Sequence, residues 1–467
     1  MGGRRTGRLR GRAVRRSTPT AWLGRLARCA ALALTGATAI GCDPGPAQHS
    51  APRHLALITV DTLRADRLGV YGYAAADTPS IDALAAESLR FERAYAHASA
   101  TVPSMASLFT GQLPAQHGVL NNAGRIPAGA PTLAERLRGA GFATAAFVGN
   151  WALRPGRGFE RAFETYTHSF IGREAVRPQP ENPGRRLTDQ ALGWLDQRDP
   201  DARFLLWVHY QEPHGPYDPP SYDAQRGAEG AERERILHRS RTNSGRGAIP
   251  AYQWLGHGRL GDYLARYDGE VAETDRQIGR LLEGLRERRL LEDTLVILTA
   301  DHGEAFGEEN LYLAHGEGLG EVLVRVPLVI RMPGRPGAVR SDAVRLIDVA
   351  PTALALLGVE ADGLAGQSLL REDGDRIAVA QLEPLRGGTR WRAIRDGRYE
   401  LRETQPGGLA LRDLERGGAS LAPDAEPEVR SRLGAALREL APWASAGAPP
   451  ALSEQDREGL RALGYVD

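Results

Sequence analysis

Five short apolar runs in this 467-residue chain have the length of buried β-strands, and polar side chains follow most of them directly. Stretches with helical periodicity lie between these runs, at 79–89, 132–140 and 263–289. Strands that alternate with helices predict an α/β fold with a sheet of many parallel neighbours. The five runs are 54–60, 142–148, 204–208, 294–299 and 326–330.

The polar residues after these runs are candidates for a functional site. Asp61 follows the first run, His214 comes shortly after the third, and Asp301 and His302 follow the fourth. Ligands of open α/β sheets bind beyond the carboxyl ends of the strands. We therefore expect Asp61, His214, Asp301 and His302 to lie along one rim of the sheet.

Asp61, Asp301 and His302 have the side chains of a divalent-metal site. Two carboxylates and one imidazole can form an Asp2His ligand set, and the hydroxyl of Thr101 could complete it. The imidazole favours zinc or manganese over calcium or magnesium, which prefer oxygen ligands alone. A lone Asp-His pair would be weak evidence, because capping and surface roles are common.

Thr101 opens the run TVPSMASLFTG, in which Pro103 suits the first turn of a helix. We expect Thr101 to lie just before that helix, where unpaired N–H groups and the helix dipole favour an anionic ester. The alternative is that Thr101 is only an N-cap, a common role for threonine.

Residues 1–42 are typical of a bacterial lipoprotein signal. Nine arginines within residues 1–28 precede a short apolar stretch that ends in Ala39-Ile40-Gly41-Cys42. We expect acylation at Cys42 and a lipid-anchored protein in the cell envelope, on its periplasmic or extracellular face. An ordinary cleaved signal or an uncleaved anchor is the alternative.

The rest of the chain is on balance acidic, which argues against a nucleic-acid partner. The two cysteines, Cys29 and Cys42, both lie in the signal region, so the mature chain has no disulfide, zinc–thiolate site or cysteine nucleophile. We expect a linker at 43–52, a catalytic domain at 53–370 and a smaller C-terminal subdomain at 371–467. The oligomeric state stays open.

Several motifs, in this order, resemble the sulfatase family of the alkaline-phosphatase superfamily. The resemblance covers about residues 53–467 and implies a large mixed, mostly parallel sheet between helices, with a small antiparallel C-terminal sheet. The motifs lie at 61–66, 101–111, 114–118, 301–304, 325–328, 348–352 and 452–465.

The resemblance also implies roles for individual residues. Asp61, Asp301 and His302 match metal ligands, and Thr101 matches the nucleophile, which also contacts the metal. His214 and His315 match residues that contact the ester or its leaving group. Asn122 matches an amide on substrate oxygens, although the sequence around it would equally suit a plain turn residue. The sites to be tested are therefore Asp61, Thr101, Asn122, His214, Asp301, His302 and His315.

Three positions depart from the family pattern. Thr62 stands where many sulfatases have a second metal-binding aspartate, and Met105 replaces the motif arginine. Thr101 replaces the cysteine or serine that becomes formylglycine, so no formylglycine is expected.

We therefore predict a metal-dependent hydrolase that cleaves phosphate, phosphonate or sulfate esters through a covalent intermediate on Thr101. Its substrate would be a small-molecule or envelope ester. One alternative is a transferase that moves a phosphoethanolamine-type headgroup in the cell envelope. Another is a non-catalytic binding protein on a degenerate sulfatase scaffold, suggested by Met105 and Thr62.

Overall fold

The computed structural model describes residues 51–168, 183–224, 230–372, 374–385, 387–443 and 452–466. These residues belong to one compact unit. The predicted signal segment 1–42, its lipidation site Cys42 and nearly all of the predicted linker lie outside the described residues. No helix in the described part of the chain is long and apolar enough to cross a membrane.

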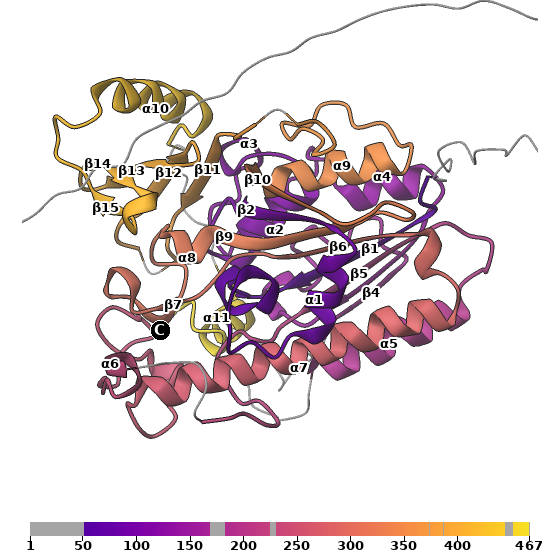
Figure 1. The fold of residues 1–467 in the computed structure, drawn as a ribbon, viewed down its shortest axis with the longest axis horizontal. Helices are drawn as coiled ribbons and strands as arrows, with labels where there is room; N and C mark the ends of the chain where they lie inside the picture. The colour runs from indigo at the N-terminus through magenta and orange to yellow at the C-terminus, as the bar shows by residue number, and fades with distance from the viewer. Residues whose placement is uncertain are drawn as a thin grey trace, which may run out of the picture. The chain divides into compact units, whose positions relative to one another are not determined.

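An eight-stranded mixed sheet forms the centre of the unit (Figure 1). The strand order is β10-β2-β9-β6-β1-β5-β3-β4, and only the two pairs that involve β9 are antiparallel. The predicted mixed, mostly parallel sheet is confirmed. Its strands are β1 (His54–Val60), β2 (Leu89–Tyr95), β3 (Ala143–Val148), β4 (Thr165–His168), β5 (Phe204–Tyr210), β6 (Thr294–Ala300), β9 (Arg325–Arg331) and β10 (Ala338–Arg345).

Helices cover both faces of this sheet, with α2, α4 and α9 on one face and α1, α5 and α7 on the other (Figure 1). The central strands β1, β5 and β6 are buried along their whole length. Burial on both faces explains why these strands read as continuous apolar runs. The helices are α1 (Pro79–Ala86), α2 (Thr101–Thr110), α4 (Leu133–Gly139), α5 (Pro183–Gln197), α7 (Leu260–Glu287) and α9 (Val349–Leu356).

Strand β2 was not predicted from the sequence. Its residues, LRFERAY, mix half-buried arginines and a glutamate with buried apolar residues, so no apolar run marks it. The strand has this composition because it lies near the edge of the sheet, between β9 and the edge strand β10.

A second, five-stranded antiparallel sheet follows in the C-terminal part, as predicted. Helix α10 (Pro427–Leu440) packs on it through Leu433 and Leu437, which join a core with Ile394 and Leu401. The last helix, α11 (Glu454–Ala462), instead contacts the 3-10 turn Trp151–Leu153 of the large unit. The strands are β11 (Ala378–Leu382), β12 (Arg390–Arg395), β13 (Tyr399–Gln405), β14 (Leu409–Asp413) and β15 (Ala419–Ser420).

Short elements build the loops around the sheet's carboxyl rim. The hairpin strands β7 and β8 follow β6, and Arg246 in the loop before α7 forms a β-bridge with Leu311 beside them. These elements are α3 (Pro114–His117), α6 (Gly230–Arg233), β7 (Ala305–Phe306), β8 (Tyr312–Ala314) and α8 (Glu321–Val324).

Two buried histidines away from this rim make stability depend on pH. Burial lowers the pKa of His97 to about 4 and that of His117 to about 3, so both are neutral in the folded state. Below the unfolded-state pKa of about 6.5, the unfolded chain binds protons that the folded protein cannot. The contribution of these two histidines to stability is therefore complete above pH 6.5 and is lost as the pH drops toward the folded-state values.

We expect the free energy of unfolding to fall on the order of 2 kcal/mol per histidine between pH 6.5 and pH 5. Urea unfolding at pH 7.5, 6.5 and 5 measures this slope. The variant His117→Asn should show a shallower dependence, because one of the two groups is gone. A His117→Asn variant whose free energy of unfolding depends on pH as steeply as that of the unaltered protein would contradict this expectation.

Candidate active site

The carboxyl ends of β1, β5 and β6 place the predicted polar residues next to one another. Strand β1 pairs in parallel with both β5 and β6, so Asp61 after β1 lies beside Asp301 after β6. The backbone N–H of Asp61 donates to the carbonyl of Tyr210 at the end of β5 (2.9 Å). Asp61, His214, Asp301 and His302 all lie at this rim, as the parallel strand order predicts. All four side chains are fully buried.

Thr101 is the first residue of α2, whereas the sequence placed it just before the helix. The N-cap position belongs to Ala100. The Thr101 hydroxyl instead lies 3.4 Å from His302 Nε2 and 3.1 Å from the hydroxyl of Tyr465, and Asn150 Nδ2 donates to it at 3.5 Å. The side chain therefore points into the site, and it does not cap its own helix.

Asn122 takes over the capping role at this helix end. Its Oδ1 accepts a hydrogen bond from the Val102 N–H (2.8 Å), while its Nδ2 finds no partner among the described residues. Since Asn122 lines a cavity and its buried Nδ2 has no partner among the described residues, this nitrogen can donate to a ligand. Asn122 thus has a structural role through Oδ1, while its contact with a substrate stays a prediction.

His214 and His315 face each other across the site, with ring centroids 4.9 Å apart. His214 Nδ1 lies 2.8 Å from the Gly215 carbonyl, which can only accept, so this nitrogen carries the proton and Nε2 presents a lone pair. Burial lowers the pKa of His214 to about 4, which keeps it neutral. The Nε2 atoms of His214 and His315 lie 3.3 Å and 3.2 Å from the Tyr465 hydroxyl.

Glu304 is a fully buried carboxyl group behind His315. Its Oε1 lies 3.0 Å from His315 Nδ1, and its Oε2 accepts a hydrogen bond from the Tyr217 hydroxyl (3.1 Å). Burial raises the pKa of Glu304 to about 7. As a carboxylate, Glu304 can hold the proton on Nδ1 and stabilise a positive charge on the His315 ring.

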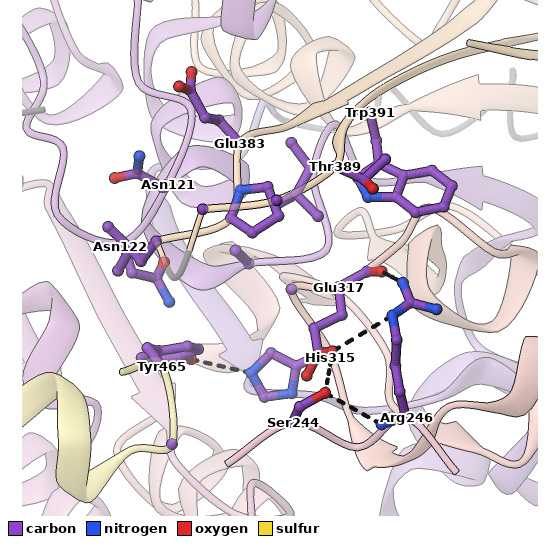
Figure 2. A pocket seen from close by; sticks show the side chains of 18 residues that line it. Asn121, Asn122, Ser244, Arg246, His315, Glu317, Glu383, Thr389, Trp391 and Tyr465 are labelled. Atoms are coloured by element: carbon purple, nitrogen blue, oxygen red, sulfur yellow. Dashed lines mark hydrogen bonds and ion pairs between the residues drawn. The ribbon is translucent and has the colours of Figure 1, made fainter. Parts of the chain in front are cut away.

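A cavity of about 350 Å³ includes Ala100, Asn122, His315 and Tyr465 in its wall, and Ala100 immediately precedes Thr101 in the chain. Figure 2 shows Tyr465 and His315 joined by their hydrogen bond, with Arg246, Ser244 and Glu317 in a second hydrogen-bonded group. Ser244 and Arg246 come from the segment between β5 and α7. At these two residues, the segment forms part of the cavity wall.

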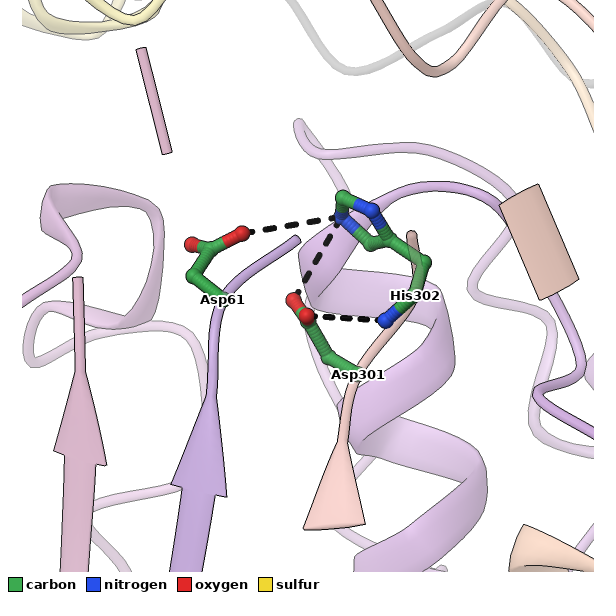
Figure 3. A group of neighbouring side chains, drawn as sticks. All are labelled: Asp61, Asp301 and His302. Atoms are coloured by element: carbon green, nitrogen blue, oxygen red, sulfur yellow. Dashed lines mark hydrogen bonds and ion pairs between the residues drawn. The ribbon is translucent and has the colours of Figure 1, made fainter. Parts of the chain in front are cut away.

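Asp61, Asp301 and His302 form a compact group whose ligand atoms all lie within 4.8 Å of one another (Figure 3). His302 Nε2 is 3.4 Å from Asp301 Oδ2 and 3.8 Å from Asp61 Oδ1. His302 Nδ1 faces the Gly303 carbonyl (3.0 Å), so the lone pair of Nε2 points toward both carboxylates. This is the orientation of an imidazole that binds a metal.

The electrostatics of the group call for a cation. Burial and the nearby charge of Asp61 raise the pKa of Asp301 to about 6. Burial opposes a charge on His302, but the carboxylates of Asp301 and Asp61 raise its pKa above the ordinary value. Burial would also raise the pKa of Asp61, yet interactions with the surrounding histidines keep it below its usual value. Two carboxylates so close together need a positive charge between them.

Unpartnered atoms identify where that charge fits. Asp61 Oδ1 and Asp301 Oδ2 are buried and accept no hydrogen bond from the described residues. Their other oxygens are engaged, since Asn150 donates to Asp61 Oδ2 and the N–H groups of Thr62 and His302 donate to Asp301 Oδ1. Each carboxylate thus keeps one oxygen for a ligand. The three side chains fit a divalent cation bound by oxygen and imidazole.

The two other departures from the family pattern have distinct structural roles. Thr62 has a positive φ of 54°, and its backbone N–H supports Asp301 Oδ1. Its buried hydroxyl oxygen has no hydrogen-bond partner among the described residues. Met105 is fully buried in the main hydrophobic core, where its uncharged side chain needs no ionic partner.

Three further side chains of the site were not singled out from the sequence. Asn150 follows β3 and donates to Asp61 and Thr101, while His209 at the end of β5 has its Nε2 3.6 Å from Asp61 Oδ2. Both could have been found with the rule that located Asp61, since both lie at strand ends. Tyr465 follows no strand, and only its place in the C-terminal motif 452–465 pointed to it.

Comparisons with known proteins identify a family for this chain. The sulfatase family model matches residues 53–359. An arylsulfatase of Clostridium perfringens is 25% identical over 381 residues, which cover 68% of this chain and 78% of that protein. Human arylsulfatase A is 31% identical over 343 residues, which cover 66% of this chain and 64% of that protein.

Solved structures share the fold at low sequence identity. The phosphonate monoester hydrolase of Agrobacterium radiobacter superimposes with a TM-score of 0.67 at 22% identity, covering 83% of this chain and 95% of that one. A protein solved in complex with its substrate D-glucosamine-2-N,6-O-disulfate gives a TM-score of 0.69 at 21% identity, with 84% and 97% covered. Since the family model matches most of the chain, the protein belongs to the sulfatase family.

Proposed function

We propose that the protein is a metal-dependent hydrolase that cleaves phosphate or phosphonate esters through a covalent intermediate on Thr101. The observation that carries this proposal is the position of the Thr101 hydroxyl at the start of α2, 3.4 Å from His302 Nε2 of the Asp61–Asp301–His302 group. A hydroxyl beside a cation site and a helix N-terminus suits attack on an anionic ester.

Threonine itself favours phosphorus over sulfur. A formylglycine hydrate releases sulfate when it collapses back to the aldehyde, and a sulfated threonine has no such exit. A phosphorylated threonine can be hydrolysed by in-line attack of water at phosphorus. The named relatives include sulfatases, and a fold neighbour is a phosphonate monoester hydrolase, so both ester classes belong in any test.

The side chains around Thr101 have different roles in this proposed reaction. Asp61, Asp301 and His302 would hold the cation, with zinc or manganese suited to one imidazole among oxygens. Such a cation, when bound, lowers the pKa of a nearby hydroxyl and withdraws charge from the ester oxygens. Asn122 Nδ2 is free to donate to a substrate oxygen, and His315 can hold a proton near the leaving oxygen, backed by Glu304.

A parallel assay tests this function. The purified protein would be stripped of metal, reloaded with zinc or manganese, and assayed on nitrophenyl phosphate, bis-nitrophenyl phosphate, phenylphosphonate esters and nitrophenyl sulfate. We expect metal-dependent cleavage of a phosphorus ester and little cleavage of the sulfate. Faster cleavage of the sulfate ester would overturn the argument from the threonine, and loss of metal dependence would overturn the assignment of the three ligands.

A further inference from the structure

The Tyr465 hydroxyl is the nearest polar group to the Thr101 hydroxyl among the contacts that the structure shows. It lies 3.1 Å from Thr101 Oγ1, closer than His302 Nε2 at 3.4 Å or Asn150 Nδ2 at 3.5 Å. The same phenol oxygen lies 3.2 Å from His315 Nε2. A residue 364 positions along the chain therefore bridges Thr101 and a histidine of the leaving-group side.

The donors and acceptors around Thr101 leave one good acceptor for its proton. The amide nitrogen of Asn150 can only donate, so it uses a lone pair of Thr101 Oγ1. His302 Nε2 points its lone pair at the carboxylates of Asp61 and Asp301, where the cation would bind. The Tyr465 oxygen is the remaining neighbour that can accept a hydrogen bond from Thr101.

The Tyr465 hydroxyl has two histidine nitrogens within reach as acceptors for its own proton. Glu304 Oε1 lies 3.0 Å from His315 Nδ1 and the Tyr465 hydroxyl lies 3.2 Å from Nε2, so a proton held on Nδ1 leaves the Nε2 lone pair for the tyrosine. His214 Nε2 is also within reach at 3.3 Å, but behind its Nδ1 stands the neutral Gly215 carbonyl. Of the two rings, His315 is the one with a carboxyl group behind it, the kind of partner that stabilises an imidazolium.

The C-terminal segment holds Tyr465 in place firmly. Leu460 and Leu463 are buried in the main core, and Asp456 pairs with Arg154 and with Arg157 (3.1 Å). These contacts fix α11 on the large unit before the chain turns toward the site.

A tight turn then directs the ring into the cavity. Gly464 has a φ of +79°, and a Cβ there would lie 2.2 Å from the Tyr252 ring. The Tyr465 N–H donates to the Leu460 carbonyl (2.8 Å), and Asn243 Nδ2 donates to the Val466 carbonyl (2.8 Å). Hydrogen bonds on both sides of Tyr465 fix its backbone, so its side chain keeps a constant position in the cavity wall.

We propose that Tyr465 is a catalytic residue that relays the Thr101 proton to His315, so that the C-terminal segment completes the active site. The proposal rests on the proposed function. As Thr101 Oγ1 forms its bond to phosphorus, its O–H bond breaks and the proton passes to the Tyr465 oxygen. The tyrosine's own proton passes to His315 Nε2. The P–O bond to the leaving group breaks with its electron pair, and the His315 imidazolium returns the proton to that oxygen.

The variant Tyr465→Phe tests the relay, because it removes the hydroxyl and keeps the ring in the wall. Its matched control is Tyr252→Phe, which makes the same change beside the same C-terminal segment. We expect Tyr465→Phe to slow formation of the phosphorylated enzyme by about 100-fold, the range of one proton-transfer group. Rapid quench with mass spectrometry measures that step. The Kd of inorganic phosphate, from calorimetry, should stay within about twofold, and Tyr252→Phe should behave as the unaltered protein.

A double variant separates the relay from a loss of packing. If Tyr465 and His315 act in one chain, adding Tyr465→Phe to His315→Gln should cost little beyond His315→Gln alone. Full additivity of the two losses would overturn the relay, as would a Tyr465→Phe enzyme whose kcat/KM is unchanged or raised while Thr101→Ala is inactive. Turnover that persists in Thr101→Ala would instead refute the proposed function itself.

Discussion

Replacing Thr101 by alanine is expected to lower kcat by at least about a thousandfold, because the substitution removes the attacking oxygen. The hydroxyl lies within 3.5 Å of His302, Asn150 and Tyr465, and Thr101 is the first residue of α2. The fold should tolerate the change, since Asn122 caps the helix.

The matched control is Thr101→Ser, which keeps a hydroxyl on the same backbone and loses one methyl group. We expect it to retain activity within about tenfold of the unaltered enzyme, the scale of a small misplacement of the reacting atom. Incubation with a phosphorus ester, followed by acid quench and mass spectrometry, should find phosphate on residue 101 in both hydroxyl forms. Turnover of Thr101→Ala above a tenth of the normal rate would exclude Thr101 as the nucleophile.

The second large effect concerns the metal. Asp301→Asn should lower the affinity for zinc or manganese by at least about 100-fold, because it removes one negative charge and one anionic ligand. The asparagine Oδ1 can still accept the N–H groups of Thr62 and His302, so the local backbone should keep its shape. Metal titration against a competing chelator measures the affinity.

Thermal unfolding provides an independent readout of the same variant. Asp301 stands beside Asp61 with a pKa raised to about 6, so a neutral amide relieves repulsion in the metal-free protein. Without metal, we expect the Tm of Asp301→Asn to equal or exceed that of the unaltered protein. Added metal should raise the Tm of the unaltered protein and leave that of the variant unchanged. Asp189→Asn, on α5 with its side chain 54% exposed, serves as the control and should bind metal normally. Normal metal affinity in Asp301→Asn would remove Asp301 from the ligand set.

For His214 and His315, the sequence predicted a shared place in the site but could not predict the tautomers. His214 and His315 were assigned to the leaving group by resemblance, and the structure brings their rings within 4.9 Å of each other. Their tautomers could not be read from the sequence, because they depend on the Gly215 carbonyl for one ring and the Glu304 carboxylate for the other. These partners decide which histidine can stabilise a proton.

The first residue of α2 was predicted less accurately from the sequence. Pro103 indicated a helix after Thr101, but the helix begins at Thr101 itself. The cause is Asn122, which caps the Val102 N–H from a loop 20 residues further along the chain. Local sequence signals do not contain a cap that arrives from another segment.

The sequence by itself determined the alternation of strands and helices, and through it the rim on which Asp61, Asp301 and His302 meet. It could do so because parallel strands have all their carboxyl ends at one edge, so the residue after each strand is placed by local pattern alone. Only the tertiary structure decided that Tyr465 reaches Thr101. That contact depends on the docking of α11 through Leu460, Leu463 and Asp456, and packing between distant segments leaves no periodic signal in the chain.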